Sequence, residues 1–264
     1  MSKPTINRHL IDCQEFMKDI PDNFYDLAIV DPQYGIGAHK MNMGSSPNRN
    51  EKGQYPAESV AVKVRKKAKN RLNDGRGKLR NRFLNQSDCS WDAEPPSPEY
   101  FKELFRVSKN QIIWGGNYFD LPPTRCIVVW DKVQPWENFS QVEIAWTSFD
   151  YPAKIFRYSN KGGDNSKRLE KIHETEKPVE LYKFCLNKFA KPGFKILDTH
   201  GGSFSHAFAC YILGFDLDIC EIDPYKYEVA EERFQNFLKA QEEIQQFGYA
   251  KTAISKNYPT LNFE

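Results

Sequence analysis

The last third of the chain holds the pattern that most limits its fold. Residues 194–198 and 215–221 are segments of strand length with several apolar side chains each, and the second ends in Glu221. Between them lie a polar turn containing Gly201-Gly202 and a helical segment. A strand, a glycine turn, a helix and a second strand ending in an acid are typical of a nucleotide-binding βαβ unit. The pattern predicts an α/β fold with a mixed, mostly parallel sheet and helices on both faces.

The glycine turn and the acid together indicate a cofactor site. Glycines after a strand let a cofactor approach the backbone, and Glu221 can accept hydrogen bonds from two ribose hydroxyls. The turn does not match GxGxxG, which argues against a dinucleotide cofactor, and the chain has no GxxxxGK[ST] phosphate loop. A tight turn between strand and helix, with no ligand, is the alternative that this pattern leaves open.

A second constellation stands near the start of the chain. Residues 25–31 form an apolar run that stops at Pro32 and is followed by Gln33 and Tyr34. The Asp31 carboxylate and the Pro32 carbonyl can both accept hydrogen bonds from one amine, and the ring of Tyr34 offers a face on which a base can stack. Such stacking would use the ring and not the hydroxyl. By itself the segment favours a simple turn that leaves a strand, since Asp-Pro commonly starts a turn.

The remaining pattern predicts one domain over residues 1–264 with a long insertion. Residues from about 35 to 95 are polar and aperiodic, which is typical of a functional or disordered loop. A smaller polar stretch, about 150–172, is a candidate recognition element. Elsewhere the periodicity predicts helices over residues 12–20, 97–106, 178–189 and 223–238, and strands over residues 111–114, 126–130 and 142–146.

Charge is distributed unevenly along the chain. Of 37 basic and 35 acidic residues, ten basic residues and only Asp74 among the acids lie between residues 61 and 82. The rest of the chain therefore carries 27 basic and 34 acidic residues, a net charge of −7. An acidic body with one strongly basic segment predicts a polyanionic partner bound at a defined place. The candidate contacts are Lys63, Arg65, Lys66, Lys67, Lys69 and Arg71.

Three motifs give these features a common interpretation. Asp31-Pro-Gln-Tyr34 resembles the Asp-Pro-Pro-Tyr catalytic motif of the amino-methylating DNA methyltransferases. Asp198-Thr-His-Gly-Gly-Ser203 resembles their S-adenosylmethionine motif, and His173-Glu-Thr-Glu-Lys177-Pro178 resembles the His-x-Thr-x-Lys-Pro element that precedes it. The catalytic motif comes first and the cofactor motif last, as in the beta group of the family. Two departures are Gln33, in place of a proline, and Phe204, in place of a glycine.

The resemblance implies a Rossmann-like methyltransferase fold and transfer of a methyl group from S-adenosylmethionine to the N6 amine of adenine in DNA. A cytosine-N4 DNA or RNA methyltransferase, or a nucleic-acid-binding module that has lost activity, are the alternatives. A homodimer and a cognate restriction endonuclease are compatible partners. The implied catalytic residues are Asp31, Pro32, Gln33 and Tyr34, and the implied cofactor-binding residues are Asp12, Cys13, Asp31, Thr175, Lys177, Asp198, His200, Gly201, Gly202, Ser203, Glu221 and Ile222. Phe204 is expected to add bulk near the methionine part of the cofactor.

Other features of the sequence bear on the cellular location and on metal binding. Six cysteines without a CxxC pair are typical of reduced thiols, and no stretch resembles a secretion signal or a membrane span. We therefore expect a cytoplasmic protein without a membrane partner. The spacing of His200, His206 and Cys210 fits no standard zinc pattern, so no metal is expected.

Overall fold

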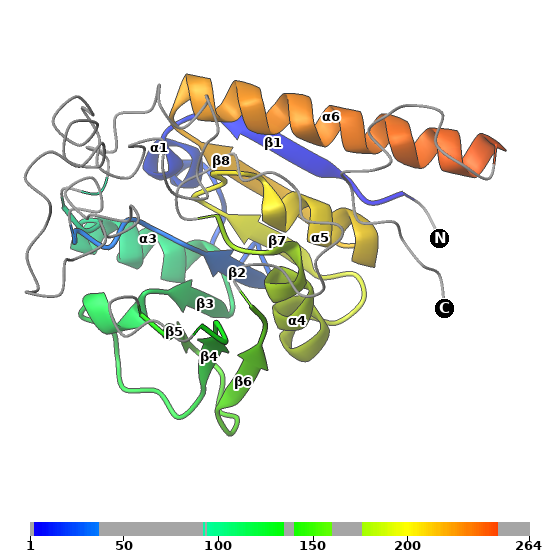
Figure 1. Ribbon diagram of the computed structural model, residues 1–264. Coiled ribbons are helices and arrows are strands. Elements are labelled where there is room, and N and C mark those ends of the chain that lie inside the picture. The colour runs from blue at the N-terminus through cyan, green and yellow to red at the C-terminus, as the bar shows by residue number, and fades with distance from the viewer. Residues whose placement is uncertain (1–2, 37–91, 93, 135–139, 160–175, 248–264) are drawn as a thin grey trace, which may run out of the picture.

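The computed structural model describes residues 3–36, 92, 94–134, 140–159 and 176–247, and these residues build one eight-stranded sheet flanked by helices (Figure 1). The strand order is β1-β8-β7-β2-β3-β5-β4-β6. The strands are β1 (Ile6–Leu10), β2 (Leu27–Val30), β3 (Gln111–Trp114), β4 (Ile127–Asp131), β5 (Val142–Thr147), β6 (Lys154–Arg157), β7 (Lys195–Asp198) and β8 (Asp216–Glu221). The helices are α1 (Cys13–Lys18), α3 (Pro98–Val107), the short 3₁₀ helix η5 (Gly116–Tyr118), α4 (Val179–Phe189), α5 (Ser205–Leu213) and α6 (Pro224–Phe247).

The topology creates a natural ligand-binding crevice between β2 and β7. These two strands are parallel neighbours, with Ala28 beside Leu197. From β7 the chain passes through α5 to β8 on one side, whereas from β2 it reaches β3 on the other side. Ligands of open α/β sheets bind outside the carboxyl ends of the strands at such a switch point. The loops that follow β2 and β7 are thus at the same edge.

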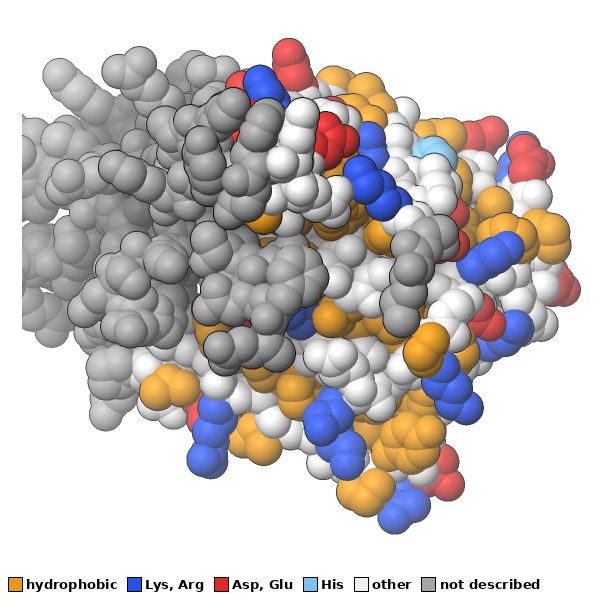
Figure 2. All heavy atoms as spheres, turned by 90° about the vertical axis from the view of Figure 1, so that its right-hand side faces the viewer, with side chains coloured by type: hydrophobic (Ala, Val, Ile, Leu, Met, Phe, Trp, Pro, Cys, Tyr) orange, Lys and Arg blue, Asp and Glu red, His pale blue; other side chains and the backbone are white. Residues whose placement is uncertain are grey.

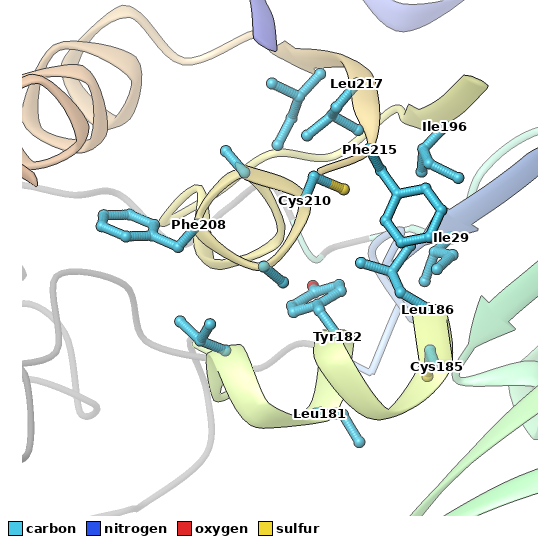
Figure 3. Packing of buried hydrophobic residues seen from close by; sticks show 14 of the residues in the cluster. Ile29, Leu181, Tyr182, Cys185, Leu186, Ile196, Phe208, Cys210, Phe215 and Leu217 are labelled. Atoms are coloured by element: carbon cyan, nitrogen blue, oxygen red, sulfur yellow. The ribbon is translucent and has the colours of Figure 1, made fainter. Parts of the chain in front are cut away.

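Alternation along the buried strands divides the core into two layers. In β2, Leu27 and Ile29 point to one face of the sheet, whereas Ala28 and Val30 point to the other. The first face is covered by α4, α5 and α6, and Figure 3 shows the Tyr182 ring of α4 directed toward α5. The second face is covered by α1 and α3. The all-apolar sequence of β2 follows from this burial on both faces.

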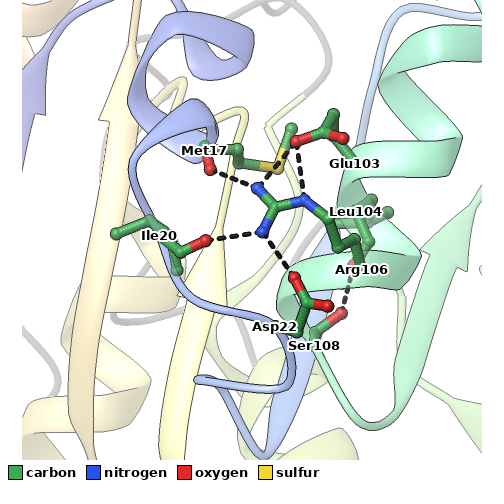
Figure 4. A network of polar contacts seen from close by, with 7 residues as sticks. All are labelled: Met17, Ile20, Asp22, Glu103, Leu104, Arg106 and Ser108. Atoms are coloured by element: carbon green, nitrogen blue, oxygen red, sulfur yellow. Dashed lines mark hydrogen bonds and ion pairs between the residues drawn. The ribbon is translucent and has the colours of Figure 1, made fainter.

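Helix ends on the α1–α3 side are fixed by polar side chains. Ser97 caps α3 and Pro98 occupies its first turn. In the last turn, the Arg106 guanidinium donates to the carbonyls of Met17 and Ile20 at 2.8 and 2.6 Å (Figure 4). It also binds Glu103 at 2.7 Å and Asp22 at 2.9 Å. One side chain therefore ties the last turn of α3 to the end of α1 and to the segment that follows it.

The structure confirms the predicted elements and adds two strands. The predicted strands over residues 111–114, 126–130, 142–146, 194–198 and 215–221 are present within one or two residues. The additional strands are β1 and β6. β6 lies within the stretch 150–172 and pairs with β4, so this part of the expected recognition element belongs to the sheet.

The described surface carries charges of both signs. Figure 2 shows basic and acidic side chains interspersed with apolar ones on the side of the molecule that lies to the right in Figure 1. None of the described helices is long and apolar enough to cross a membrane.

Candidate active site

A pocket opens where the loops after β2 and β7 meet. It is bordered by the start of α4, by the end of β8 and by the start of α6, so separate chain segments converge on it. Among the described residues, its walls are formed by Asp31, Gln33, Glu176, Lys177, Tyr182, His200, Gly201, Gly202, Ser203, Glu221, Ile222, Asp223 and Lys226.

Asp198 anchors the glycine loop from below the pocket. One carboxylate oxygen accepts a hydrogen bond from the His200 backbone N–H at 3.0 Å, and the other lies 2.9 Å from Nδ1 of His206. The Asp198 side chain is buried and, among the described residues, is not part of the pocket wall. Asp198 therefore shapes the loop rather than facing a ligand. His200, which does line the pocket, is neutral near pH 7, because burial lowers its pKa to about 4.

The glycine loop makes a close approach to Phe204. A Cβ atom on Gly201 would lie 2.7 Å from the Phe204 ring and 3.0 Å from the Cys220 carbonyl oxygen, so a side chain there has no room. Phe204 itself adopts φ of 56°, the left-handed region that glycine occupies without strain. Its ring is fully buried in the core with an edge toward Tyr227. The expectation that Phe204 crowds the cofactor is wrong, because the backbone turn directs its ring away from the pocket.

Glu221 fastens the glycine loop to the end of β8. Its carboxylate accepts hydrogen bonds from the backbone N–H groups of Gly202 (2.8 Å), Ile222 (3.0 Å) and Asp223 (2.9 Å). Burial raises the pKa of Glu221, although these amides oppose the rise. A carboxylate has about four acceptor positions, so it retains capacity for one hydroxyl donor from a ligand.

These features fit the adenosine part of S-adenosylmethionine. Gly201 and Gly202 line the pocket without side chains, and Glu221 supplies a fixed acceptor in the same wall. Ile222 is 63% exposed at the same wall and offers an apolar contact for a purine. The chemistry of the donor set therefore matches a nucleoside more closely than a phosphate, which would require converging amide or cationic donors.

On the opposite wall, Asp31 is part of a cluster of polar groups. Lys177 Nζ lies 2.5 Å from one Asp31 oxygen, and the Tyr34 hydroxyl donates to the other at 2.7 Å. Lys177 also donates to the Tyr34 hydroxyl at 3.1 Å. The Lys177 side chain is only 2% exposed. The structure thus brings together three residues that the sequence places in two distant motifs.

A second acid, which the sequence analysis did not identify, completes the cluster. Glu143 of β5 has one oxygen 3.2 Å from Lys177 Nζ and the other 2.5 Å from Lys132 Nζ. The four side chains form a row of alternating charges, Asp31–Lys177–Glu143–Lys132. The sequence feature that could have identified Glu143 is its place as an acid within the otherwise apolar segment 142–146, because a buried carboxylate requires a partner.

Burial and ion pairing shift the pKa values in this cluster in opposite directions. Burial raises the pKa of Asp31, and Lys177 opposes that rise without cancelling it. Burial would also raise the pKa of Glu143, but its two lysine partners outweigh burial and lower it to about 2. The pKa of Lys177 is raised because its two carboxylate neighbours outweigh its burial. Lys177 is therefore charged at neutral pH. Of the two acids, Asp31 is protonated more readily than Glu143.

The ring of Tyr34 is held in a stack. It lies parallel to Tyr118, with ring centroids 4.9 Å apart and an angle of 16°. On Gly115, whose φ is +73°, a Cβ would approach the Tyr34 ring to 2.2 Å. The backbone N–H of Tyr34 donates to Asp92 at 2.8 Å. The Tyr34 hydroxyl has a contact that the sequence did not indicate, since it donates to Asp31, and stacking of a base on the ring stays a prediction.

The other predicted site residues are placed as follows. Asp12 caps α1 at the end of β1, beside Cys13, and neither is among the described residues of the pocket wall. The Ile11 N–H donates to the Glu221 carbonyl at 3.0 Å, so both are close to the cofactor side. Pro32 is buried behind Asp31. Thr175 and the candidate DNA contacts Lys63, Arg65, Lys66, Lys67, Lys69 and Arg71 lie outside the described residues.

The cysteines and histidines in the described ranges form no metal site. No three His, Cys, Asp or Glu side chains within the described part of the chain are arranged to hold an ion. Burial raises the pKa of Cys13 to about 12, so its thiol is neutral. Cys126, Cys185, Cys210 and Cys220 are free and buried in the described structure, where they act as small apolar core residues.

Comparison with known families gives a match over most of the chain. A family model of the N6/N4 type, described as DNA methylase, matches residues 35–232 of the 264. The Asp31–Tyr34 segment lies just before the matched residues. A comparison with curated protein sequences finds no significant match.

Comparison with solved structures finds similarity over most of the chain. PvuII DNA methyltransferase, described as cytosine-N4-specific, has 13% identity and a TM-score of 0.51, and the alignment covers 93% of each chain. M1.HpyAVI in complex with SAM has 12% identity and a TM-score of 0.44, covering 87% of this chain and 98% of its own. TTHA0409 from Thermus thermophilus, complexed with S-adenosyl-L-methionine, has 13% identity and a TM-score of 0.47, covering 87% and 93%.

Proposed function

The chain belongs to the N6/N4 DNA methylase family, and we propose that it transfers a methyl group to the exocyclic N6 amine of adenine in DNA. S-adenosylmethionine is the cofactor of this family and DNA is its substrate. The choice of adenine rests on Asp31, because the cytosine-N4 enzymes that this chain resembles more often carry serine at that position. The single observation that carries the proposal is that Asp31 lines the same pocket as the glycine loop.

The amine of adenine is a weak nucleophile because its lone pair is conjugated with the ring. Two acceptors, the Asp31 carboxylate and the Pro32 carbonyl, would draw its N–H groups out of the ring plane and free the lone pair. Transfer would form the nitrogen–carbon bond and break the sulfonium sulfur–carbon bond, leaving the demethylated thioether, and the amine would lose one proton to solvent. Positioning supplies most of the rate in such an in-line displacement. Neither a metal nor a covalent enzyme intermediate takes part in this scheme.

We assign the cofactor to the glycine-loop side of the pocket. Gly201, Gly202 and Ser203 would line its nucleoside, Glu221 would accept from a ribose hydroxyl and Ile222 would contact the purine. When bound, S-adenosylmethionine supplies an electrophilic sulfonium methyl group. Asp12, Cys13 and Asp198 then support this wall from behind, whereas Lys177 is on the side of the catalytic loop. We propose that Lys177 and Thr175, the latter outside the described residues, are near the methionine end of the cofactor.

The target base must leave the duplex to reach Asp31, because the amine is inaccessible within stacked base pairs. Tyr34 and Tyr118, which is 46% exposed, form an aromatic stack next to Asp31. An extruded base would stack on Tyr34 in place of the Tyr118 ring. The interpretation as an inactive module loses part of its motivation, since Phe204 points into the core.

The proposal is tested by identifying the product. The purified chain is incubated with isotope-labelled S-adenosylmethionine and unmethylated genomic DNA, and the DNA is digested to nucleosides and analysed by mass spectrometry. We expect labelled N6-methyladenine, and none in a parallel reaction with Asp31→Ala. Labelled N4-methylcytosine would replace the adenine assignment. Absence of any labelled base would favour a nucleic-acid-binding module.

We propose further that residues 61–82 contact the phosphate backbone. Each neutralised phosphate releases counterions, so affinity should fall steeply with salt. Replacing Lys66, Lys67 and Lys69 with alanine should reduce the slope of log K against log salt by roughly 0.9 for each phosphate that is no longer neutralised. The matched control replaces Lys188, Lys191 and Lys239, which are exposed on the described surface. Equal slopes for both triple variants would exclude a specific role for the basic segment.

A further inference from the structure

Asp31 would need no charged partners to accept hydrogen bonds from an amine, yet Lys177, Glu143 and Lys132 form a row of charges next to it. We propose that Lys177, held in place by Glu143, is a positioning residue that fixes the orientation and the negative charge of the Asp31 carboxylate. The inference rests on the proposed role of Asp31 as the acceptor for the target amine. It assigns a role to Lys177 that differs from contact with the cofactor, and it assigns Glu143 to the site for the first time.

The geometry fixes both oxygens of Asp31. Lys177 Nζ lies 2.5 Å from one oxygen and the Tyr34 hydroxyl lies 2.7 Å from the other. With a donor on each oxygen the carboxylate cannot rotate without breaking a contact, yet each oxygen keeps a further lone pair for an amine N–H. Lys177 in turn is held from the far side by Glu143 at 3.2 Å. Lys132 completes the row by binding the other Glu143 oxygen at 2.5 Å.

The charge of Asp31 matters because only the ionised form is purely an acceptor. A protonated carboxyl group would present a donor to the amine and could no longer draw out its N–H. The titratable groups facing Asp31 are Lys177, Glu143 of β5, Tyr34 of its own loop and Tyr182 of α4. Lys177 is the cation of this set in direct contact with Asp31, and burial and Glu143 both favour protonation of Asp31. Removing Lys177 would therefore leave two buried carboxylates facing each other.

This arrangement predicts opposite effects for two substitutions. In Lys177→Met, the acidic limb of the pH–rate profile should move to higher pH by about 1 unit or more, since an opposite charge at contact distance shifts a pKa by roughly 1–3 units. In Glu143→Gln, the limb should move to lower pH, because Asp31 loses a like charge and keeps the cation. Lys177→Arg should retain the wild-type limb in part. Because the groups are coupled, the limb reports the cluster as a whole.

The experiment measures single-turnover methyl transfer to unmethylated genomic DNA between pH 5 and pH 9. Cofactor affinity is measured in parallel by titration calorimetry. The double variant Lys177→Met/Glu143→Gln should recover part of the activity that Lys177→Met loses near neutral pH. The matched control is Lys109→Met, which breaks a lysine–aspartate pair of 2.7 Å whose lysine is 52% exposed, away from the pocket. Its pH profile should equal that of the wild type.

The outcomes separate this inference from the proposed function. An unshifted limb in Lys177→Met, with weakened cofactor binding, would overturn the inference and assign Lys177 to the cofactor. An unshifted limb in Glu143→Gln would remove Glu143 from the site, and this variant remains informative if Lys177→Met does not fold. Failure of the wild type to methylate DNA would instead reject the proposed function. A wild type that forms N4-methylcytosine would change the substrate and leave the test of Lys177 intact.

Discussion

The two walls of the pocket are built by different physical means. The glycine-loop wall is defined by backbone: Glu221 accepts from three amide groups, and Gly201 has no space for a side chain. The catalytic wall is defined by side-chain charges that come from the segments at the ends of β2, β4, β5 and the start of α4. Backbone groups fix the shape of a ligand site, whereas paired charges fix which side chains are ionised. Substitutions in the glycine-loop wall should therefore change stability or cofactor affinity. Substitutions in the catalytic wall should change the methyl-transfer rate and its dependence on pH.

The largest effect is expected from the core beneath the glycine loop. Phe204→Ala removes a fully buried ring and leaves a cavity, so the free energy of unfolding should fall by about 3–5 kcal/mol. Urea denaturation measures this loss. The control Phe24→Ala removes a ring that is 38% exposed and should cost about 1 kcal/mol or less. A similar loss in both variants would show that the loop does not depend on this packing.

On the other wall, Asp31→Ala should reduce the rate of methyl transfer by about 100-fold or more, because a preorganised acceptor is removed. The cofactor affinity should change little, since the proposed cofactor contacts lie on the glycine loop and at the end of β8. Asp31→Asn should retain slightly more activity, because its amide oxygen accepts one hydrogen bond. Stopped reactions with labelled cofactor give the rate, and calorimetry gives the affinity. A large loss of cofactor binding would mean that the two walls are not independent.

Glu221→Ala tests the backbone wall directly. It removes an acceptor from three amide groups and from the proposed ribose contact, so cofactor binding should weaken by about 1–3 kcal/mol. Saturating cofactor should restore the rate, because Asp31 and its partners are untouched. Calorimetry and rate measurements at increasing cofactor concentration check the two statements. An unchanged affinity would move the ribose contact to another residue.

The smallest effect is expected at Gln33. Its side chain lines the pocket, and the family that the chain resembles carries proline there. If the position only shapes the loop, Gln33→Pro should leave the methyl-transfer rate within a few-fold of wild type. Gln33→Ala is the control that removes the side chain without constraining the backbone. Loss of activity in both variants would assign Gln33 a contact with the extruded base.

Local sequence patterns predicted the backbone wall and left most of the charged wall hidden. The run 194–221 contains its strand, turn, helix and acid in order, so periodicity and glycine spacing were sufficient. Glu143 and Lys132 reach Lys177 only through the antiparallel pairing of β4 with β5, which no local pattern specifies. Strand β1 was missed because polar residues occupy most of its five positions. The placement of Phe204 was wrong because its side-chain direction depends on the left-handed turn.

The parallel pairing of β1 with β8 has a consequence for synthesis of the chain on the ribosome. Ile6 lies beside Leu217, so the first strand cannot pair until the eighth has been translated. At translation rates of about 5–20 residues per second, the nascent β1 remains without its partner for roughly 10–40 s. Long-range pairing of this kind also slows folding after release. The arginine and histidine of β1 provide charge and polarity on this unpaired segment, and charged side chains oppose association of exposed strand edges between nascent chains.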